Sequence, residues 1–182
     1  TPITFNAFIP IYLDHKTKVC KPKTVDNSER VTKLFAAWYG DMLIHELRPK
    51  HLEDYMGRRF EEKPKLSKQT VNLDVKTLKE LMEYAVQREY TKENQFRKVK
   101  LLRVEKRKKL FFSEDQIEIC LSYVKNQTLR KLYRFGLLTG MRRGEVVFLL
   151  RSDIDMEQQQ GVIHIRASKY YSPKADKERE LP

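Results

Sequence analysis

A short, strongly basic block near the middle of the chain constrains the fold more than any other feature. Residues 94–109 hold eight Lys or Arg side chains and one Glu, which gives a local charge of +7. Residues 1–93 carry +3 and residues 110–182 carry +2, and together these make the net charge of +12. Like charges at this density repel one another and keep a segment extended unless a polyanion neutralises them. The block therefore predicts a basic linker at 94–110, between one domain at 1–93 and another at 111–182.

The charge of this block favours nucleic acid as the partner, because nucleic acid is the commonest polyanion that such a segment meets. A solvated linker or a localisation signal is the alternative interpretation of the same charges. Contacts between basic side chains and phosphates set the position of a protein on a duplex and carry little sequence information. The candidate DNA-binding residues of the block are Arg97, Lys98, Lys100, Arg103, Lys106, Arg107, Lys108 and Lys109.

Four amphipathic helical patterns fill residues 1–93, each with apolar side chains at the spacing of one helix face. Pro2 suits the start of the first helix, Gly40 the end of the second and Pro49 the start of the third. Ser67 is the expected N-cap of the fourth. We interpret the four apolar faces as the core of a helical domain. Their residues are Phe5, Phe8, Ile9, Tyr12 and Leu13; Val31, Leu34, Phe35 and Trp38; Leu52, Tyr55, Met56 and Phe60; and Val71, Val75, Leu78, Met82, Ala85 and Val86.

Residues 111–182 predict helices followed by a β-hairpin. Ser113 and Gln116 form a capping-box pattern, and Gly140 is placed to end a later helix. A β-branched, alternating stretch then indicates a strand. The expected helices run from Ser113 to about Lys125, from about 128 to 138, and from about Arg143; the expected strands are 161–166 and a partner that begins at 180. The whole chain is therefore expected to be mainly α, with a small β component in its second domain.

The sequence lacks the motifs of the common nucleotide-binding, metal-dependent and serine-dependent enzymes. It contains no P-loop, no G-x-G-x-x-G, no H-E-x-x-H and no G-x-S-x-G. The carboxylates are dispersed over amphipathic helices, and the histidines His15, His45, His51 and His164 lack metal-ligand spacing. We therefore expect no metal and no other cofactor. The pattern argues against metal-dependent nucleases and most hydrolases.

Cysteine usage and hydropathy bear on the compartment. No apolar run reaches 18 residues, so we expect no membrane span. Only Cys20 and Cys120 occur, and Cys120 shares an apolar helical face with Ile117 and Leu121. We therefore predict that Cys120 is a buried free thiol and that no structural disulfide forms. This usage is typical of a reducing, cytoplasmic compartment.

Arg142 and Lys169 are the candidate catalytic cations. Arg142 lies just past an expected helix end, in a Gly-flanked turn, where its planar guanidinium can make two hydrogen bonds to a phosphate. Glu145, three residues later, is placed to orient it. Lys169 follows an expected strand, at the tip of a hairpin that can enter a DNA groove. Without further context, an arginine or a lysine at such a position is more often a solvated surface charge than a functional residue.

The second half of the chain resembles the tyrosine recombinases of the phage integrase type. LLTGMRRGEV at 137–146 resembles the first arginine box of the family, typically T-G-L-R-x-[SG]-E. FLLRSDID at 148–155 is similar to the "L.W.DID" stretch that follows it. IHIRASK at 163–169, with KERELP at 177–182, resembles the strand of the active-site lysine and a partner strand that ends "R.vP". FFSEDQI at 111–117 matches the opening of the catalytic domain.

The first half resembles the same family. Residues 67–96 are similar to the last helix of its core-binding domain, where "NPF" is usual and Gln95 replaces the proline. The resemblance spans nearly the whole chain, with five stretches in the order of the family. It implies a four-helix SAM-like core-binding domain, joined by the basic linker to a truncated α+β catalytic domain with a β-hairpin.

The resemblance also implies roles for individual residues. Arg142 matches the first catalytic arginine, which binds the scissile phosphate and stabilises charge on its oxygens. Glu145 matches the acidic residue that supports the arginine turn. Lys169 matches the active-site lysine, the proposed general acid for the leaving 5′ hydroxyl. Lys68 and Gln69, at the start of the fourth helix, are the candidates for reading base sequence.

Two of these roles have rivals. Arg143 neighbours Arg142, but successive side chains on a helix diverge by about 100°, so Arg143 should point elsewhere. Lys174 and Lys177 lie in the same expected hairpin as Lys169 and compete for its role. The sequence favours Arg142 and Lys169 without excluding the others.

The family implies a reaction, but the chain holds only part of its machinery. Family members join DNA through a 3′-phosphotyrosyl intermediate without ATP or metal, and they act on double-stranded DNA as homotetramers. The H-x-x-R box and the nucleophilic tyrosine of the family follow the hairpin, and the 182 residues end at Pro182 before either of them. Tyr170 and Tyr171 lie in the hairpin turn, so neither is expected to be the nucleophile. We therefore expect this polypeptide to bind DNA and not to cleave it. A non-catalytic DNA-binding regulator of a mobile element and a helical protein–protein adaptor are the alternatives.

Overall fold

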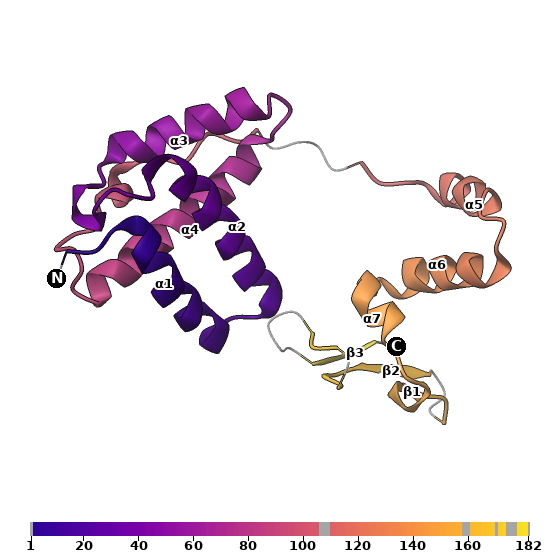
Figure 1. Ribbon diagram of the computed structural model, residues 1–182. Coiled ribbons are helices and arrows are strands. Elements are labelled where there is room, and N and C mark those ends of the chain that lie inside the picture. The colour runs from indigo at the N-terminus through magenta and orange to yellow at the C-terminus, as the bar shows by residue number, and fades with distance from the viewer. Residues whose placement is uncertain (1, 106–109, 158–160, 170, 174–177, 182) are drawn as a thin grey trace. The chain divides into compact units, whose positions relative to one another are not determined.

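The computed structural model describes residues 2–105, 110–157, 161–169, 171–173 and 178–181 (Figure 1). The chain divides into two compact units, Thr1–Arg107 and Lys108–Pro182, and each is described by itself. The first is helical, and the second combines helices with a small antiparallel sheet. The expected class, mainly α with a β component in the second domain, is therefore confirmed.

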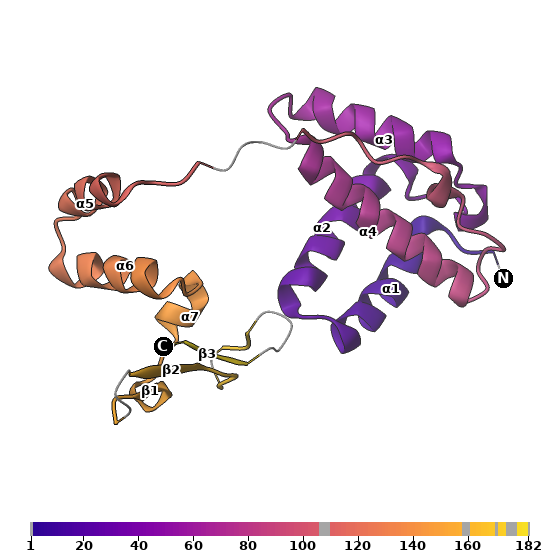
Figure 2. The same cartoon turned by 180° about the vertical axis from the view of Figure 1, so that it is seen from behind.

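Four α-helices build the first unit. They are α1 (Phe5–Val19), α2 (Pro22–Tyr39), α3 (Pro49–Glu62) and α4 (Lys68–Gln87), with the short 3₁₀ helices η1 (Ile44–Glu46) and η2 (Gln95–Lys98). α1 packs along α2, and α4 packs against both α2 and α3 (Figures 1 and 2). All four helices were expected from the periodicity of the sequence.

The helix ends follow local hydrogen bonding. Ser67 caps α4, because its hydroxyl accepts a hydrogen bond from the backbone N–H of Thr70 at 3.1 Å, as predicted. The predicted start of α1 at Pro2 is wrong, because the hydroxyl of Thr4 caps the helix instead and Phe5 is its first residue. Gly40 ends α2 with a right-handed backbone. A Cβ on this glycine would lie 2.4 Å from the side-chain amide of Asn6, so close packing explains the residue.

The apolar faces of the four helices meet in one core. Phe35 lies at its centre, with ring centroids 4.9 Å from Phe5, 5.5 Å from Tyr55 and 5.8 Å from Phe96. The most deeply buried members of the predicted faces are Phe5, Phe8, Tyr12, Val31, Phe35, Leu52, Tyr55, Val71, Val75, Leu78, Met82 and Ala85. The interpretation of these faces as core is therefore confirmed.

A buried carboxylate joins three helices of this core. Asp74 of α4 is fully buried and accepts hydrogen bonds from Arg30 of α2 at 2.7 Å, and from Tyr55 and Arg59 of α3 at 3.1 and 3.2 Å. Arg59 is itself almost completely buried. Burial and the charge of Asp74 raise the pKa of Tyr55, which keeps its hydroxyl a donor. Charges that leave water need such partners to offset the loss of hydration.

The first part of the expected linker belongs to the first unit. Residues 94–102, which we call the strap, run along α3 and α4 (Figure 2). Phe96 and Val99 are buried, and the side-chain amide of Asn72 bonds both the N–H and the C=O of Leu102, at 2.8 and 2.9 Å. Residues 94–102 are therefore packed on the first unit, whereas the sequence predicted an extended linker from residue 94. Apolar residues interspersed among the basic ones anchor the strap to the core.

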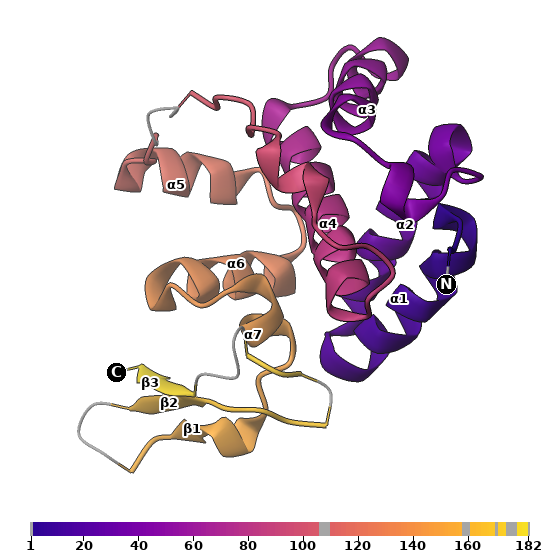
Figure 3. The same cartoon turned by 90° about the vertical axis from the view of Figure 1, so that its left-hand side faces the viewer.

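The second unit places a small sheet after three helices. Its elements are α5 (Glu114–Ser122), α6 (Gln127–Thr139), α7 (Arg143–Val147), the 3₁₀ helix η3 (Arg151–Asp153), β1 (Ile154–Asp155), β2 (Val162–Ile165) and β3 (Arg179–Leu181) (Figure 3). The sheet is antiparallel in the order β1-β2-β3, with Ile163 opposite both Ile154 and Leu181. The expected β2–β3 pair and the capping box of α5 are confirmed. β1 was missed because two residues carry no readable alternation.

The apolar face of α5 and α6 is exposed. Tyr133 and Leu137 of α6 are more than half exposed, and Cys120 of α5 is exposed as well. The prediction that Cys120 is buried is therefore wrong, because within the described ranges little packs over this face. Cys20 and Cys120 are both free thiols in the structure. Among the described helices, none has the length and apolar character needed to cross a membrane.

We expect Asp74→Ala to destabilise the first unit by about 3–5 kcal/mol, because it leaves the buried guanidinium of Arg59 without its main partner. Urea unfolding followed by fluorescence of Trp38, the only tryptophan, measures this unit selectively. The matched control is Asp26→Ala, an exposed position of α2, where the change should stay within about 0.5 kcal/mol. Equal losses in the two variants would contradict a stabilising role for the buried network.

Candidate active site and nucleic-acid interface

The turn between α6 and α7 holds Arg142 in a defined position. α6 ends at Gly140, whose φ of 62° is in the left-handed region that favours glycine. Arg142 is the N-cap residue of α7, with an extended backbone. A helix therefore stops and another starts within three residues. The backbone of Arg142 is fixed by this geometry, as the glycines of the sequence predict.

The carboxylate of Glu145 holds the turn between α6 and α7 in place through hydrogen bonds. Its Oε2 accepts a hydrogen bond from the backbone N–H of Arg142 at 2.7 Å, and its Oε1 accepts one from Nη1 of the same arginine at 2.8 Å. Oε2 also accepts a hydrogen bond from Nη2 of Arg179 in β3, at 2.7 Å. The Glu145 side chain is fully buried, whereas 54% of the Arg142 side chain is exposed. One edge of the Arg142 guanidinium is thus held by Glu145, and much of the group faces solvent.

These contacts determine the ionisation of Glu145. Burial by itself raises the pKa of the carboxyl group, but the hydrogen bonds from Arg142 and the charge of Arg179 outweigh it. The pKa of Glu145 therefore lies below its ordinary value. The carboxylate is charged at neutral pH, and it offsets the charges of two arginines.

The two neighbouring arginines have different surroundings. Arg142 pairs with Glu145, whereas Arg143 lines a hollow among apolar side chains of α5, α6 and α7, including Leu132 and Val147. This divergence matches the expectation that Arg143 points elsewhere. It supports Arg142 as the candidate for phosphate binding.

The turn that contains Lys169 lies against α7. Ser168 and Tyr171 exchange backbone hydrogen bonds across it, at 2.7 and 3.3 Å. The ring of Tyr171 stacks on Phe148, which directly follows α7, with centroids 5.9 Å apart. The turn of Lys169 and the turn of Arg142 are therefore joined through α7 in one unit. The rival lysines Lys174 and Lys177, and Tyr170, lie outside the described residues.

Four of the predicted DNA-contacting residues of the first unit lie at the start of α4. Lys68 and Gln69 are exposed in its first turn. Asn72, one turn later, binds Leu102, so the exposed side chains of Lys100, in the strap, and Arg103, directly after it, lie beside the same end of the helix. Tertiary packing thus places together residues that are 30 positions apart in the sequence. Lys106, Arg107, Lys108 and Lys109 lie outside the described residues.

Two basic residues of the strap have partners within the unit. Arg97 forms an ion pair with Glu83 of α4, and its Nε donates at 2.9 Å. The hydrogen bond from Arg97 is the main reason that the pKa of Glu83 lies below its ordinary value. Lys98 donates to Gln95 at 2.7 Å and lies 3.9 Å from Glu93. Part of the local charge of +7 is therefore offset by acidic side chains, which the charge count did not reveal.

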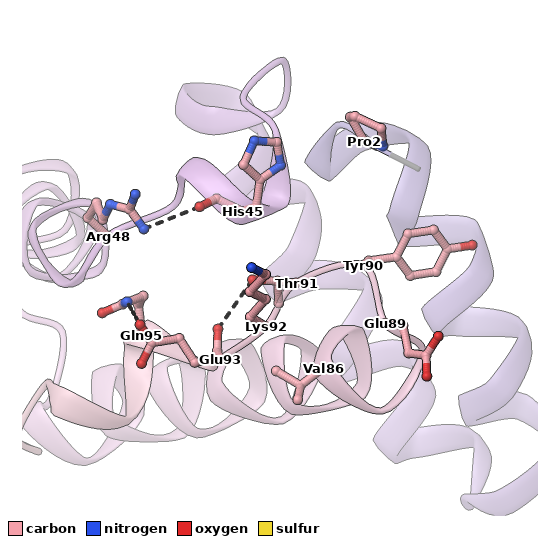
Figure 4. Close-up of a pocket in the computed structure, with 10 residues that line it drawn as sticks. All are labelled: Pro2, His45, Arg48, Val86, Glu89, Tyr90, Thr91, Lys92, Glu93 and Gln95. Atoms are coloured by element: carbon pink, nitrogen blue, oxygen red, sulfur yellow. Dashed lines mark hydrogen bonds between the residues drawn. The ribbon is translucent and has the colours of Figure 1, made fainter.

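A separate pocket at the other end of α4 contains none of the predicted site residues. Figure 4 shows His45 and Arg48 across it from Glu93 and Gln95. The lining mixes both signs of charge, which disfavours a phosphate site. Among the described side chains, no group of three or more His, Cys, Asp or Glu residues is able to hold a metal ion.

Two functional-site contacts were missed by sequence reasoning. Arg179 shares the carboxylate of Glu145 with Arg142, although 34 residues separate it from Glu145. The stacking of Tyr171 on Phe148 spans 23 residues. Neither contact leaves a periodic signal in the sequence. Arg179 lies one residue before the position at which the partner strand was expected to begin.

The chain matches one protein family over more than half its length. The model of the phage integrase SAM-like domain matches residues 4–101. Among curated proteins, the ICEBs1 integrase of Bacillus subtilis (strain 168) is 26% identical over 156 residues, which cover 84% of this chain and 42% of that integrase. The SAM-like match includes all four helices of the first unit and most of the strap.

Solved integrase structures share the fold of the chain. A lambda integrase tetramer bound to a Holliday junction superposes with a TM-score of 0.78 at 16% identity, covering 99% of this chain and 51% of that one. The Tn1549 transposon integrase in complex with circular intermediate DNA gives a TM-score of 0.74 at 23% identity, covering 99% and 60%. The chain therefore spans roughly half the length of these relatives.

We expect the backbone amide resonance of Arg142 to report the ionisation of Glu145. Because the pKa in the folded chain is below the unfolded value of about 4.3, the stabilising effect of this carboxylate is complete above that value. It is lost as the pH falls through the lower, folded pKa. A ¹H–¹⁵N NMR titration should show movement of this resonance only below the ordinary range. Glu145→Gln should abolish the movement, and an inflection at or above the ordinary value would contradict the paired carboxylate.

Proposed function

The chain belongs to the tyrosine recombinase (phage integrase) family, and from this membership we propose that it grips duplex DNA and presents Arg142 and Lys169 to the phosphate that is cut. The complete protein is proposed to integrate or recombine DNA of a mobile element through a 3′-phosphotyrosyl intermediate. In this family the H-x-x-R box and the nucleophilic tyrosine follow the strands that match β2 and β3, so we propose that these 182 residues supply the DNA-gripping and phosphate-positioning part of the reaction.

The observation that carries the proposal is the Glu145 carboxylate, which holds Arg142 by both its backbone and its guanidinium. Phosphoryl transfer places extra negative charge on the non-bridging oxygens. A guanidinium that is already oriented stabilises this charge without reorganisation during the reaction. Because half of the Arg142 side chain is exposed, its remaining N–H groups are accessible to a phosphate.

Lys169 is proposed to protonate the leaving 5′ oxygen. It is exposed in a turn that is held against α7, the helix that begins after Arg142. A general acid works only within hydrogen-bond reach of the atom that it protonates. Arg142 and the turn of Lys169 both adjoin α7, which supports a role for the two cations at one phosphate.

The first unit and the strap are proposed to hold the duplex. The lambda and Tn1549 integrases were solved with DNA, and the lambda integrase is a tetramer on its junction. By this analogy we propose double-stranded DNA as the partner and a tetramer as the active assembly, in the cytoplasm of a prokaryotic cell. Lys68 and Gln69 are the proposed base-reading residues, and Lys100 and Arg103 are proposed to bind phosphates beside them.

We expect DNA binding by the chain to depend steeply on salt. If six phosphates are neutralised, the logarithm of affinity should fall against the logarithm of salt concentration with a slope of about −5. Fluorescence anisotropy of a labelled duplex measures this slope. Arg103→Ala should reduce its magnitude by about one. Arg97→Ala, which removes a side chain paired with Glu83, should change it less. A slope near zero would refute phosphate binding.

In a recombinase that contains this chain and the nucleophile, we expect Arg142→Ala to lower the yield of covalent protein–DNA complex by about 10²–10³-fold, while DNA binding is retained. A nicked suicide duplex, which traps the complex, gives the readout by denaturing electrophoresis. The matched control is Arg143→Ala, because Arg143 faces apolar side chains instead of the proposed phosphate site. Full yield from Arg142→Ala would remove this residue from the proposed site.

A further inference from the structure

We propose that Tyr171 is a positioning residue, whose ring holds the turn of Lys169 against α7 and so maintains the distance between Lys169 and Arg142. This inference rests on the proposed function, because it assumes that both cations act on one phosphate. It assigns to Tyr171 a role through its ring and not through its hydroxyl.

The first contact of the ring is with Phe148. The two rings are nearly parallel, with an interplanar angle of 18° and centroids 5.9 Å apart. Phe148 is the C-cap residue of α7, and its backbone N–H donates to the carbonyl of Gly144 at 3.1 Å. Tyr171 is therefore attached to a residue whose own backbone is tied to the first turn of the helix.

The second contact is with Gly144. A Cβ on this glycine would lie 2.9 Å from Cε2 of Tyr171 and 3.7 Å from its Cζ. A separation of 2.9 Å is too short for two carbon atoms, so a side chain at position 144 would require the Tyr171 ring to shift. Gly144 lies between Arg142, which donates to Glu145, and Glu145 itself. The ring thus packs directly on the segment that fixes the guanidinium.

The turn transmits this contact to Lys169. Tyr171 closes the turn, because its backbone N–H donates to the carbonyl of Ser168 at 3.3 Å and to the hydroxyl of Ser168 at 3.2 Å. The N–H of Ser168 donates in return to the carbonyl of Tyr171 at 2.7 Å. Lys169 therefore lies between two hydrogen-bonded residues, Ser168 and Tyr171, and Tyr171 is held against α7 by its ring. A lysine has a long, flexible stem, so the position of its backbone limits where its ammonium group can reach.

The chemistry of the proposed cleavage gives a specific readout. The attacking tyrosine, as its phenolate, forms a bond to phosphorus as the bond from phosphorus to the 5′ oxygen breaks, and the leaving oxygen takes a proton from the Lys169 ammonium group. When sulfur replaces that 5′ oxygen, the leaving group is a thiolate, whose conjugate acid has a pKa of about 8.5. The thiolate leaves without protonation, so the sulfur substrate does not need the general acid.

The experiment has two arms, and the first uses the chain itself. Backbone ¹H–¹⁵N heteronuclear NOE values at Ser168 and Lys169 measure the order of the turn on the ps–ns timescale. Tyr171→Ala should lower them, whereas Tyr171→Phe, which keeps the ring, should leave them unchanged. Gly144→Ala should lower them too, because its methyl group displaces the ring. The matched control is Gly136→Ala, where the new Cβ would lie 3.5 Å from Val146, an ordinary contact. Unchanged values in both Tyr171→Ala and Gly144→Ala would overturn the inference.

The second arm uses a recombinase that contains this chain and the nucleophile. On the oxygen substrate, Tyr171→Ala should cleave about 10–100-fold more slowly than the parent, since a misplacement on the order of 1 Å costs up to about 10²-fold. On the sulfur substrate, the defect should shrink to less than about threefold if only protonation is lost. Tyr171→Phe should cleave both substrates normally.

Lys169→Ala distinguishes the two ways in which the second arm can fail. If sulfur does not relieve the defect of Lys169→Ala, the proposed role of Lys169 is wrong. If sulfur relieves Lys169→Ala and does not relieve Tyr171→Ala, the positioning role of Tyr171 is wrong and the role of Lys169 stands. A loss of activity in Tyr171→Phe would indicate a role for the hydroxyl and would also overturn the inference.

Discussion

The buried carboxylate of Glu145 is the interaction on which the candidate site depends. It accepts hydrogen bonds from the backbone and the guanidinium of Arg142 and from the guanidinium of Arg179. These contacts connect the start of α7 with β3 and hold the turn after α6 in one conformation. An arginine on an exposed helix face would sample many rotamers, and ordering it on a phosphate would cost conformational entropy. Here most of that ordering is complete before any ligand binds.

The same physical principle organises the first unit. Asp74 lies fully buried in α4 and receives hydrogen bonds from Arg30, Tyr55 and Arg59, so one charge links three helices. In each unit a buried carboxylate, Asp74 or Glu145, orients an arginine by hydrogen bonds. In the first unit the result is a rigid scaffold, because Arg59 is buried as well. In the second unit the result is a partly exposed cation, which suits a role in binding a phosphate.

The basic block contains two kinds of segment, one packed on the core and one exposed, that its composition does not distinguish. Its first part is the strap, where Phe96 and Val99 fill the core and Arg97 pairs with Glu83. Lys100, near the end of the strap, and Arg103, directly after it, lie beside the exposed start of α4, which carries Lys68 and Gln69. The charge therefore combines an anchoring segment with a group of solvent-facing cations. Among the described basic residues of the block, Lys100 and Arg103 are the ones that a polyanion can reach without displacing a contact to Glu83, Glu93 or Gln95.

The sequence by itself determined the elements that depend on neighbours along the chain. The four helices of the first unit, the caps at Ser67 and Ser113, the stop at Gly140 and the β2–β3 pair follow from periodicity and turn chemistry, and the family followed from motif order. Only the tertiary structure decided the packing of the strap, the exposure of Cys120, the pairing of Arg179 with Glu145 and the stacking of Tyr171 on Phe148. Helical periodicity and capping reach at most a few residues along the chain, so one sequence displays them directly. A contact across 23 or 34 residues exists only after the backbone has folded back on itself, and nothing in the local pattern specifies its partner.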